Sequence, residues 1–356
     1  MRTLIDQSII GKFPLDLIEK IVYPRLGARR PEILVGPGHG RDNTVIKVGD
    51  EQVLVATADP LSVIPALGFR DSAYISVHLL ASDLATCGFP PQFLMVNLNL
   101  PPQMTNEEFK EYWTSIDSEC KKLGISVVGG HTGRYVGSGY TVVGGGVMIT
   151  IAPEQKYIAS TMSKPGDVLL MTKGVAIATT AILSRVFPET IEKAFGVSFL
   201  KKAQGYLDKF SVVEDALTAA SVGLRENGVT AMHDVTEGGL LGALYELAEA
   251  SRVGLEIELS QVIAPEEAKR VCDLFNLSPY STLSEGTLIA TVKPEKAQEV
   301  QHVLEAKGIR SAIIGRVTNR KEGRWMKTEG KKQPLVKPVS DPYWKAYWKA
   351  TREGWK

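Results

Sequence analysis

The stretch HDVTEGGLLGALYELAEASRVGLEIE, residues 233–258, decides the fold class, because a loop, a helix and a strand follow one another within it. Asp234 precedes the helix, and an aspartate at this position is a common helix N-cap. The N-cap explains Asp234 but not the glycine pair Gly238–Gly239, since glycine is a poor helix former. Two glycines at the start of a helix let the backbone come close to a bound group, and helix N-termini bind anions. We therefore interpret Gly238–Gly239 as a place where the backbone approaches a ligand.

Helical and strand-like segments alternate on both sides of this stretch. Residues 71–88 and 105–122 predict helices, the second opened by a capping box of Thr105 and Glu108, and residues 93–100 predict a strand. The alternation does not follow strict βαβ units. We therefore expect two α+β domains rather than one doubly wound sheet.

The domain boundary is expected near residue 155, because the run 152–167 has no clear periodicity and contains two prolines. The expected domains are 1–155 and 156–330. Residues 331–356 are aromatic and basic, and they predict a helix that docks on its own chain or on a partner subunit. A stacking surface for nucleic acid is the alternative for that helix.

Composition excludes several classes of function. The chain has 356 residues, and its 41 Lys and Arg against 40 Asp and Glu give a net charge of +1, which offers no electrostatic support for binding nucleic acid or an anionic membrane. No apolar run reaches the roughly 18 residues of a membrane span, and the first residues lack the continuous apolar region of a signal peptide. The three cysteines, Cys87, Cys120 and Cys272, form neither a disulfide framework nor a CxxC metal pattern, so a cytoplasmic location is expected.

Acidic residues recur beside glycine-rich turns. In VGPGHGRDN, Gly38 and Gly40 precede Asp42, and such glycines either let the backbone approach an anion or form a mobile hairpin. Asp59 closes an apolar strand before a proline, where a carboxylate is either a metal ligand or a turn cap. Asp83 lies in an otherwise apolar helix, where burying a carboxylate is costly unless it is paired or binds a cation.

A further motif, VVGGHTGR, predicts a strand over residues 126–132 that contains Gly129 and Gly130 and delivers His131 and Thr132 to a second glycine-rich loop. His131 either contacts a phosphate or a metal, or it caps a turn. Together with Asp234, the motifs supply at least four carboxylates near glycine-rich turns and no Cys/His cluster. Hard oxygen ligands of this kind suit Mg²⁺, and Mg²⁺ with glycine-rich loops suits a nucleoside triphosphate.

The order of these motifs resembles that of the superfamily of aminoimidazole ribonucleotide (AIR) synthetase, selenophosphate synthetase, thiamine-monophosphate kinase and the hydrogenase maturation protein HypE. Each of five motifs is similar to one of that superfamily: GRDNTVI, ATADP, SVHLLASDLATCGFPP, SKPGDVLLMTKG and LSEGTLIATV. Residues 233–258 are most similar to the HypE pattern. The match covers roughly residues 30–320 in order, so the series is more specific than any single motif.

This resemblance implies two α+β domains of the AIR synthase type, with the N-terminal domains of two subunits pairing into a shared β-barrel in a homodimer. It also implies Mg-ATP chemistry in which a phosphoryl group passes from ATP to an oxygen, or a similar atom, of a small-molecule or carboxamide-type acceptor. By position, the implied metal ligands are Asp42, Asp59, Asp83 and Asp234, the implied nucleotide-binding residues are Gly38, Gly40, Asp42, Gly129, Gly130 and Thr132, and the implied catalytic residues are Glu285 and His131.

The chain departs from the superfamily pattern at several positions. It ends in EGWK and its last cysteine is Cys272, so we expect no reaction through a C-terminal cysteine of the HypE kind. Asn43 replaces the usual second acid after Asp42, and Arg41 or Lys173 is expected to neutralise phosphate. The alternative function is a nucleotide-binding accessory protein without turnover, which docks in a maturation or assembly complex through its Trp-rich tail.

Overall fold

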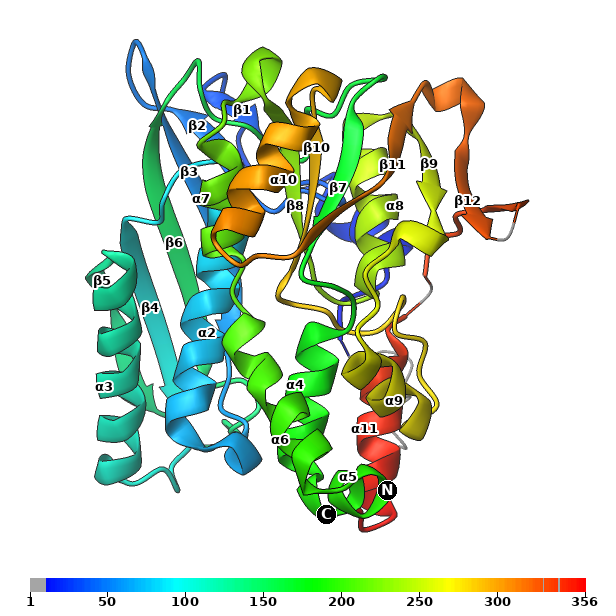
Figure 1. Ribbon diagram of the computed structural model, residues 1–356. Helices are drawn as coiled ribbons and strands as arrows, with labels where there is room; N and C mark the ends of the chain where they lie inside the picture. Colours follow the sequence, from blue (N-terminus) through cyan, green and yellow to red (C-terminus); the bar gives the residue numbers. More distant parts are fainter. Residues whose placement is uncertain (1–10, 329, 339) are drawn as a thin grey trace.

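The computed structural model describes residues 11–328, 330–338 and 340–356, and its strands form two sheets with helix α2, Gly68–Ala85, packed between them (Figure 1). The first sheet has six strands in the order β1-β2-β3-β6-β4-β5, in which β4 and β5 pair in parallel and the other neighbours pair antiparallel. Its strands are β1 (Ile33–Val35), β2 (Thr44–Lys47), β3 (Gln52–Leu61), β4 (Phe93–Leu100), β5 (Ser126–Arg134) and β6 (Gly144–Pro153).

The second sheet has seven strands in the order β13-β12-β9-β11-β7-β10-β8, in which β9 and β12 pair in parallel and the other neighbours pair antiparallel. Its strands are β7 (Val168–Thr172), β8 (Val229–Val235), β9 (Gly254–Glu258), β10 (Thr287–Val292), β11 (Ser311–Thr318), β12 (Arg324–Thr328) and β13 (Lys331–Pro334). Two separate, mostly antiparallel sheets confirm the predicted α+β class over a doubly wound sheet.

Helices surround the second sheet and cover one face of the first (Figure 1). Helix α3 (Asn106–Leu123) packs against α2, and α7 (Val213–Ala220) also contacts α2. The other helices of eight or more residues are α4 (Ile177–Val186), α5 (Pro188–Phe195), α6 (Val197–Gln204), α8 (Gly239–Ser251), α9 (Glu266–Leu274), α10 (Ala297–Ala306) and α11 (Pro342–Arg352). None of the helices in the described part of the chain is long and apolar enough to cross a bilayer.

Local signals placed several elements correctly. Helix α3 begins after Thr105, whose hydroxyl accepts from the backbone N–H of Glu108 while the Glu108 carboxylate accepts from that of Thr105, so the predicted capping box is confirmed. Strand β4 has the predicted bounds. Helix α2 begins three residues before the predicted start and ends at Ala85, where the Thr86 hydroxyl donates back to the Asp83 carbonyl.

The predicted strand over 126–132 is confirmed, but strand β5 continues to Arg134, so Gly129 and Gly130 lie within the strand and not in a glycine-rich turn. Gly130 pairs with Val96 of β4, and an added Cβ on Gly130 would lie 1.8 Å from the Val96 carbonyl oxygen. The glycine is therefore required for strand packing and not for a turn. Near the N-terminus, the short helix α1 (Leu15–Leu17) is followed by a π-helical turn that ends at Val22.

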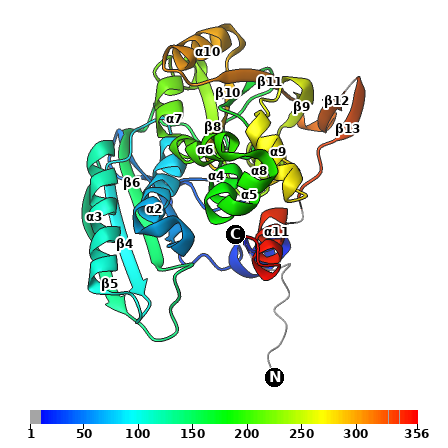
Figure 2. The same cartoon turned by 60° about the horizontal axis from the view of Figure 1, so that its bottom comes forward.

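Helix α11 docks on its own chain, next to the first described residues of the N-terminal segment (Figure 2). The Tyr343 side chain is buried, and the Tyr347 ring lies 5.7 Å from that of Phe187. The aromatic residues of the tail thus complete a hydrophobic cluster with α4, α5 and α9. Of the two docking partners predicted for this helix, the structure shows the chain itself.

Candidate functional site

Buried carboxylates from both halves of the chain converge where the end of β8 meets α2. Asp234 lies near the end of β8, Asp42 in the loop before β2, and Asp83 near the end of α2. Ligand atoms of Asp42, His233 and Asp234 all lie within 4.8 Å of one another. Asp59, on β3, shares a hydrogen bond with Asp83. The structure therefore brings together the four acids that the sequence singled out.

The acids destabilise one another's charges. Burial, followed by the charges of Asp234 and Asp59, raises the pKa of Asp83 well above its usual value. Burial and the charge of Asp42 raise the pKa of Asp234 to about 7, although a hydrogen bond with Asp83 opposes the change. Both Asp234 oxygens and Oδ2 of Asp42 are buried and accept no hydrogen bond from an N–H or hydroxyl group of the described residues. Such oxygens are available to a cation.

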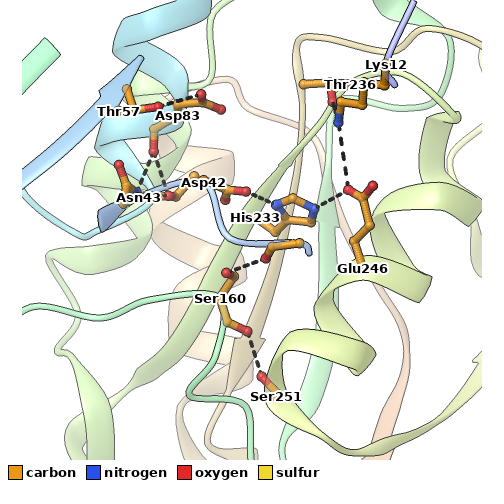
Figure 3. Close-up of polar contacts among 12 residues, drawn as sticks. Lys12, Asp42, Asn43, Thr57, Asp83, Ser160, His233, Thr236, Glu246 and Ser251 are labelled. Atoms are coloured by element: carbon orange, nitrogen blue, oxygen red, sulfur yellow. Dashed lines mark hydrogen bonds and ion pairs between the residues drawn. The ribbon is translucent and has the colours of Figure 1, made fainter. Parts of the chain in front are cut away.

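His233 supplies the positive charge of the cluster (Figure 3). Its Nδ1 lies 2.5 Å from Oδ1 of Asp42 and its Nε2 lies 3.1 Å from Oε2 of Glu246. Burial disfavours the imidazolium, but attraction to the two carboxylates outweighs burial and raises the pKa of His233 to about 10. Burial likewise opposes the charge of Glu246, yet Lys12 and His233 lower its pKa to about 2. In the chain without metal, His233 is therefore charged at neutral pH.

Uncharged side chains hold Asp83 in place (Figure 3). The Thr57 hydroxyl donates to Oδ2 of Asp83 at 2.9 Å. Asn43, where the superfamily has an acid, donates from Nδ2 to the Asp83 carbonyl and to the Thr86 hydroxyl. Asn43 therefore ties the end of α2 to the loop that carries Asp42, while its own Oδ1 stays buried without a hydrogen-bond donor among the described residues.

The loop with Gly38 and Gly40 rests on helix α8. The Gly40 carbonyl accepts from the Ser160 hydroxyl at 2.6 Å, and an added Cβ on Gly40 would lie 2.4 Å from the Glu246 carbonyl oxygen. An added Cβ on Gly38 would instead meet the Arg41 side chain, whose guanidinium donates to the Gly36 carbonyl. Packing against α8 therefore gives Gly40 a structural reason to be glycine.

His131 and Thr132 lie outside the acidic cluster, since β5 is three strand positions from β3 in the first sheet. Nε2 of His131 lies 2.7 Å from the Tyr135 hydroxyl on the exposed side of the chain. His131, Gly130 and Asp59 are among the residues that line a shallow depression of about 690 Å³ on the first sheet. Gly130 and His131 therefore face this depression, and Asp59 is the one acid of the cluster that also lines it.

Glu285 lies in the turn before β10, beside the turn that follows Asp234. Its Oε2 is buried and accepts no hydrogen bond from the described residues, and burial raises its pKa well above the usual value. Lys173 is not free to neutralise a phosphate, because its Nζ is buried 2.9 Å from Oδ2 of Asp215 and also donates to the Ser211 carbonyl.

Sequence reasoning missed three charged residues of the site: Lys12, His233 and Glu246. Nζ of Lys12 donates to the Thr236 hydroxyl at 2.9 Å and lies 3.9 Å from Oε2 of Glu246. Glu246 carries the same signal that revealed Asp83, a carboxylate within an apolar stretch of helix. No comparable pattern surrounds Lys12, because the folding of the chain brings it to the site across more than two hundred residues.

The residues present fit a divalent cation. Buried carboxylate oxygens without donors come from Asp42 and Asp234, and Asp83 adds a third carboxyl group. Oxygen ligands are those that Mg²⁺ prefers, and no cysteine lies within the cluster that the described residues form.

Two models of known protein families match this chain. The model of the AIR synthase related protein, N-terminal domain, matches residues 40–150, and that of the C-terminal domain matches residues 164–327. The chain belongs to the AIR synthase-related family. It has the mixed α/β, two-domain AIR synthase-like fold, which confirms the resemblance found in the sequence.

Similar members of the AIR synthase-related family carry different names. A putative hydrogenase expression/formation protein of Methanocaldococcus jannaschii is 24% identical over 93% of this chain and 96% of its own length. A selenide, water dikinase of Carboxydothermus hydrogenoformans is 26% identical over 82% of this chain and 88% of its own. The crystal structure of hydrogenase maturation protein HypE in complex with ATP matches with a TM-score of 0.67 at 19% identity, over 94% of this chain and 97% of that one, which shows the shared fold.

Proposed function

We propose that this protein is a Mg-ATP-dependent enzyme that transfers a phosphoryl group to an oxygen, or a similar atom, of a small-molecule or carboxamide-type acceptor. The observation that carries the proposal is the set of buried carboxylate oxygens of Asp42 and Asp234 that lack donors, beside the Asp83 carboxyl group. Buried carboxylates that repel one another are stabilised when a cation binds between them. The HypE relative solved with ATP supports the choice of nucleotide.

The residues of this chain would divide the task. Asp42, Asp83 and Asp234, with Asp59 next to them, would hold Mg²⁺, which when bound neutralises charge on phosphate oxygens. Thr57 fixes the orientation of Asp83 by its hydrogen bond.

Burial raises the pKa of Asp42, and the positive charge of His233, 2.5 Å from its Oδ1, opposes that effect and favours the carboxylate. Lys12 brings a primary ammonium group to the edge of the cluster. Glu285 and His131 remain proposed residues of the acceptor side, and Gly38, Gly40, Gly129, Gly130 and Thr132 remain proposed nucleotide contacts.

Release of phosphate from ATP tests the proposal. We expect Mg²⁺-dependent hydrolysis by the wild-type protein, a loss of at least about tenfold in Asp83→Asn, and no change in Asp208→Asn, which removes an exposed aspartate far from the cluster in sequence. ATP binding without turnover, in the presence of candidate acceptors, would favour the alternative of an accessory protein. Absence of ATP binding would overturn both.

We also propose a homodimer in which the first sheets of two subunits pair into a β-barrel. The face of this sheet that α2 leaves uncovered exposes Met95 and Val147, with 44% and 36% of their surface accessible, and Val128 of the edge strand β5 is 54% accessible. An apolar sheet face of this kind favours association with a second subunit. The proposed domain limits are 1–155, 156–330 and 331–356.

A protein partner at the C-terminal helix is a further proposal. The helix turns its aromatic residues toward its own chain, so a partner would meet its outer residues Lys345, Lys349 and Arg352.

A further inference from the structure

A second hollow lies in the C-terminal half, where the end of β9, the start of α9 and the start of β11 meet. Its volume is about 490 Å³, within the range of roughly 300 to 1,000 Å³ that small-molecule sites occupy. Among its lining residues are Gln261, Lys269, Tyr280, Arg310 and Ser311. The lining includes no aspartate or glutamate, although charged residues of both signs are equally common in the chain.

The two cations of this hollow have no counter-ion. Neither Lys269 nor Arg310 forms an ion pair with a carboxylate in the part of the chain that the structure describes. By contrast, two cations of the neighbouring strands are paired, since Arg316 of β11 and Lys327 of β12 both contact Glu256. Both cations are exposed and solvated, and the positive charge at the hollow is a local excess because no carboxylate lines it.

The hollow also holds a hydroxyl group that needs a partner. Oγ of Ser311 is buried and forms no hydrogen bond with any of the described residues. A buried hydroxyl without a partner is unfavourable, and most such groups in proteins are satisfied. Ser311 follows Arg310 directly, so a hydroxyl donor and a guanidinium are presented at one place.

The position of the hollow separates it from the acidic cluster. In the second sheet β11 is three strand positions from β8, which is about 14 Å at the usual spacing of strands. The hollow and the acidic cluster lie at the same end of the strands. Ser311 pairs with Thr172 at the end of β7, and Val235 pairs with Thr287 at the start of the antiparallel strand β10. Tyr280 connects them, since its carbonyl accepts from the backbone N–H of Leu241 in the first turn of α8.

We propose that this hollow binds a small molecule through a phosphate or carboxylate group, with Arg310, Lys269 and the Ser311 hydroxyl as its contacts. The guanidinium and the ammonium group neutralise the anion, and the hydroxyl donates the hydrogen bond that Ser311 now lacks. This site is separate from the metal cluster and does not depend on the function proposed for it.

Calorimetric titration of the full-length protein with inorganic phosphate, and in a second series with malonate, tests this inference. The titrations are done at low ionic strength with a chelator present, because phosphate could otherwise bind through a metal at the acidic cluster. The variants are Arg310→Ala and Ser311→Ala, with Lys201→Ala as the control, since Lys201 is exposed on α6 and forms no ion pair among the described residues. Arg310 is exposed as well, so its replacement leaves the core intact.

We expect at least one of the two anions to bind to the wild-type protein and to the control with the same affinity. Affinity should fall about tenfold in Arg310→Ala, equivalent to about 1.4 kcal/mol, and by a smaller factor in Ser311→Ala. Binding of phosphate alone would assign a phosphorylated ligand, and binding of malonate alone a carboxylate. The inference is overturned when neither anion binds, when Arg310→Ala binds as well as the wild type, or when Lys201→Ala loses as much affinity as Arg310→Ala.

Discussion

Replacing Asp234 by Asn should stabilise the protein without metal and abolish its response to Mg²⁺. The Asp234 side chain is 2% exposed, and its carboxylate has neighbouring acids instead of a cation. Its pKa is about 7 in the folded protein against 3.8 in the unfolded chain, so the folded state binds the proton more tightly. Stability from this group is therefore present below pH 4 and is lost as the pH rises to about 7.

The size of the effect follows from that pKa. A change from 3.8 to about 7 corresponds to about 4 kcal/mol against the charged form in the folded state. The neutral amide avoids this cost but buries two N–H donors where the Asp234 oxygens have no N–H or hydroxyl partner among the described residues, which costs about 1 kcal/mol. At pH 8, Asp234→Asn should raise the free energy of unfolding by about 3 kcal/mol, or the melting temperature by about 4 °C for a chain of 356 residues.

Thermal unfolding at pH 8, with and without Mg²⁺, measures both effects. Mg²⁺ should raise the melting temperature of the wild type and leave that of Asp234→Asn unchanged, because binding to the folded state alone stabilises it. Asp167→Asn is the matched control: Asp167 is equally buried, but it accepts from Thr230 and lies 3.3 Å from Nζ of Lys293, so its replacement should destabilise. Destabilisation of Asp234→Asn like that of the control, or an unchanged response to Mg²⁺, would refute the reasoning.

Three further predictions concern charge, association and packing. His233→Gln should lower the free energy of unfolding by about 3 kcal/mol at pH 7. The pKa of His233 is about 10 in the folded protein against 6.5 in the unfolded chain, so the stability that its charge contributes is lost as the pH rises. Chemical denaturation should therefore show a smaller stability difference between wild type and variant at pH 10 than at pH 7. A constant difference would contradict this. Val128→Lys should be a monomer in light scattering, whereas the control Val197→Lys, at a similarly exposed valine on α6, should remain a dimer. If both variants remain dimers, the proposed barrel is contradicted. Gly130→Ala should lower the free energy of unfolding by about 3 kcal/mol or more, because its Cβ would lie 1.8 Å from a carbonyl oxygen. Gly129→Ala should lower it by under about 1 kcal/mol, because no atom lies within 3.7 Å of the added Cβ. Equal melting temperatures of the two variants would show that the strand tolerates a side chain at position 130.

Local sequence signals were sufficient for much of the fold. The capping box of Thr105 and the alternation within residues 93–100 fixed two elements, because both signals depend on neighbours along the chain. The VVGGHTGR segment was different, since its glycines are needed by a neighbouring strand that is distant in sequence. A glycine required by a turn and a glycine required by close strand packing look the same in a single sequence.

The acids of the site were predictable for a related reason. A carboxylate in an apolar helix, such as Asp83, signals its own burial cost and hence the need for a partner. The partners themselves were not predictable, because His233 and Lys12 reach the cluster through tertiary contacts. The sequence therefore predicted which acids form the cluster, whereas the positions of the cations beside them could be found only from the structure.

That distribution distinguishes this site from a structural ion-pair network. In a structural network each buried acid has a donor, as Asp167 and Asp215 do here. In the cluster, the single buried imidazolium of His233 serves Asp42 and Glu246, and the oxygens of Asp234 receive no donor from the described residues. Lys12 adds a second cation beside Glu246, but neither cation is paired with Asp83 or Asp234. Ionising these two acids in the folded chain without metal therefore creates a buried excess of negative charge, which is why their pKa values are raised. A divalent cation removes that excess, and the same imbalance that weakens the free protein is the source of its affinity for the metal.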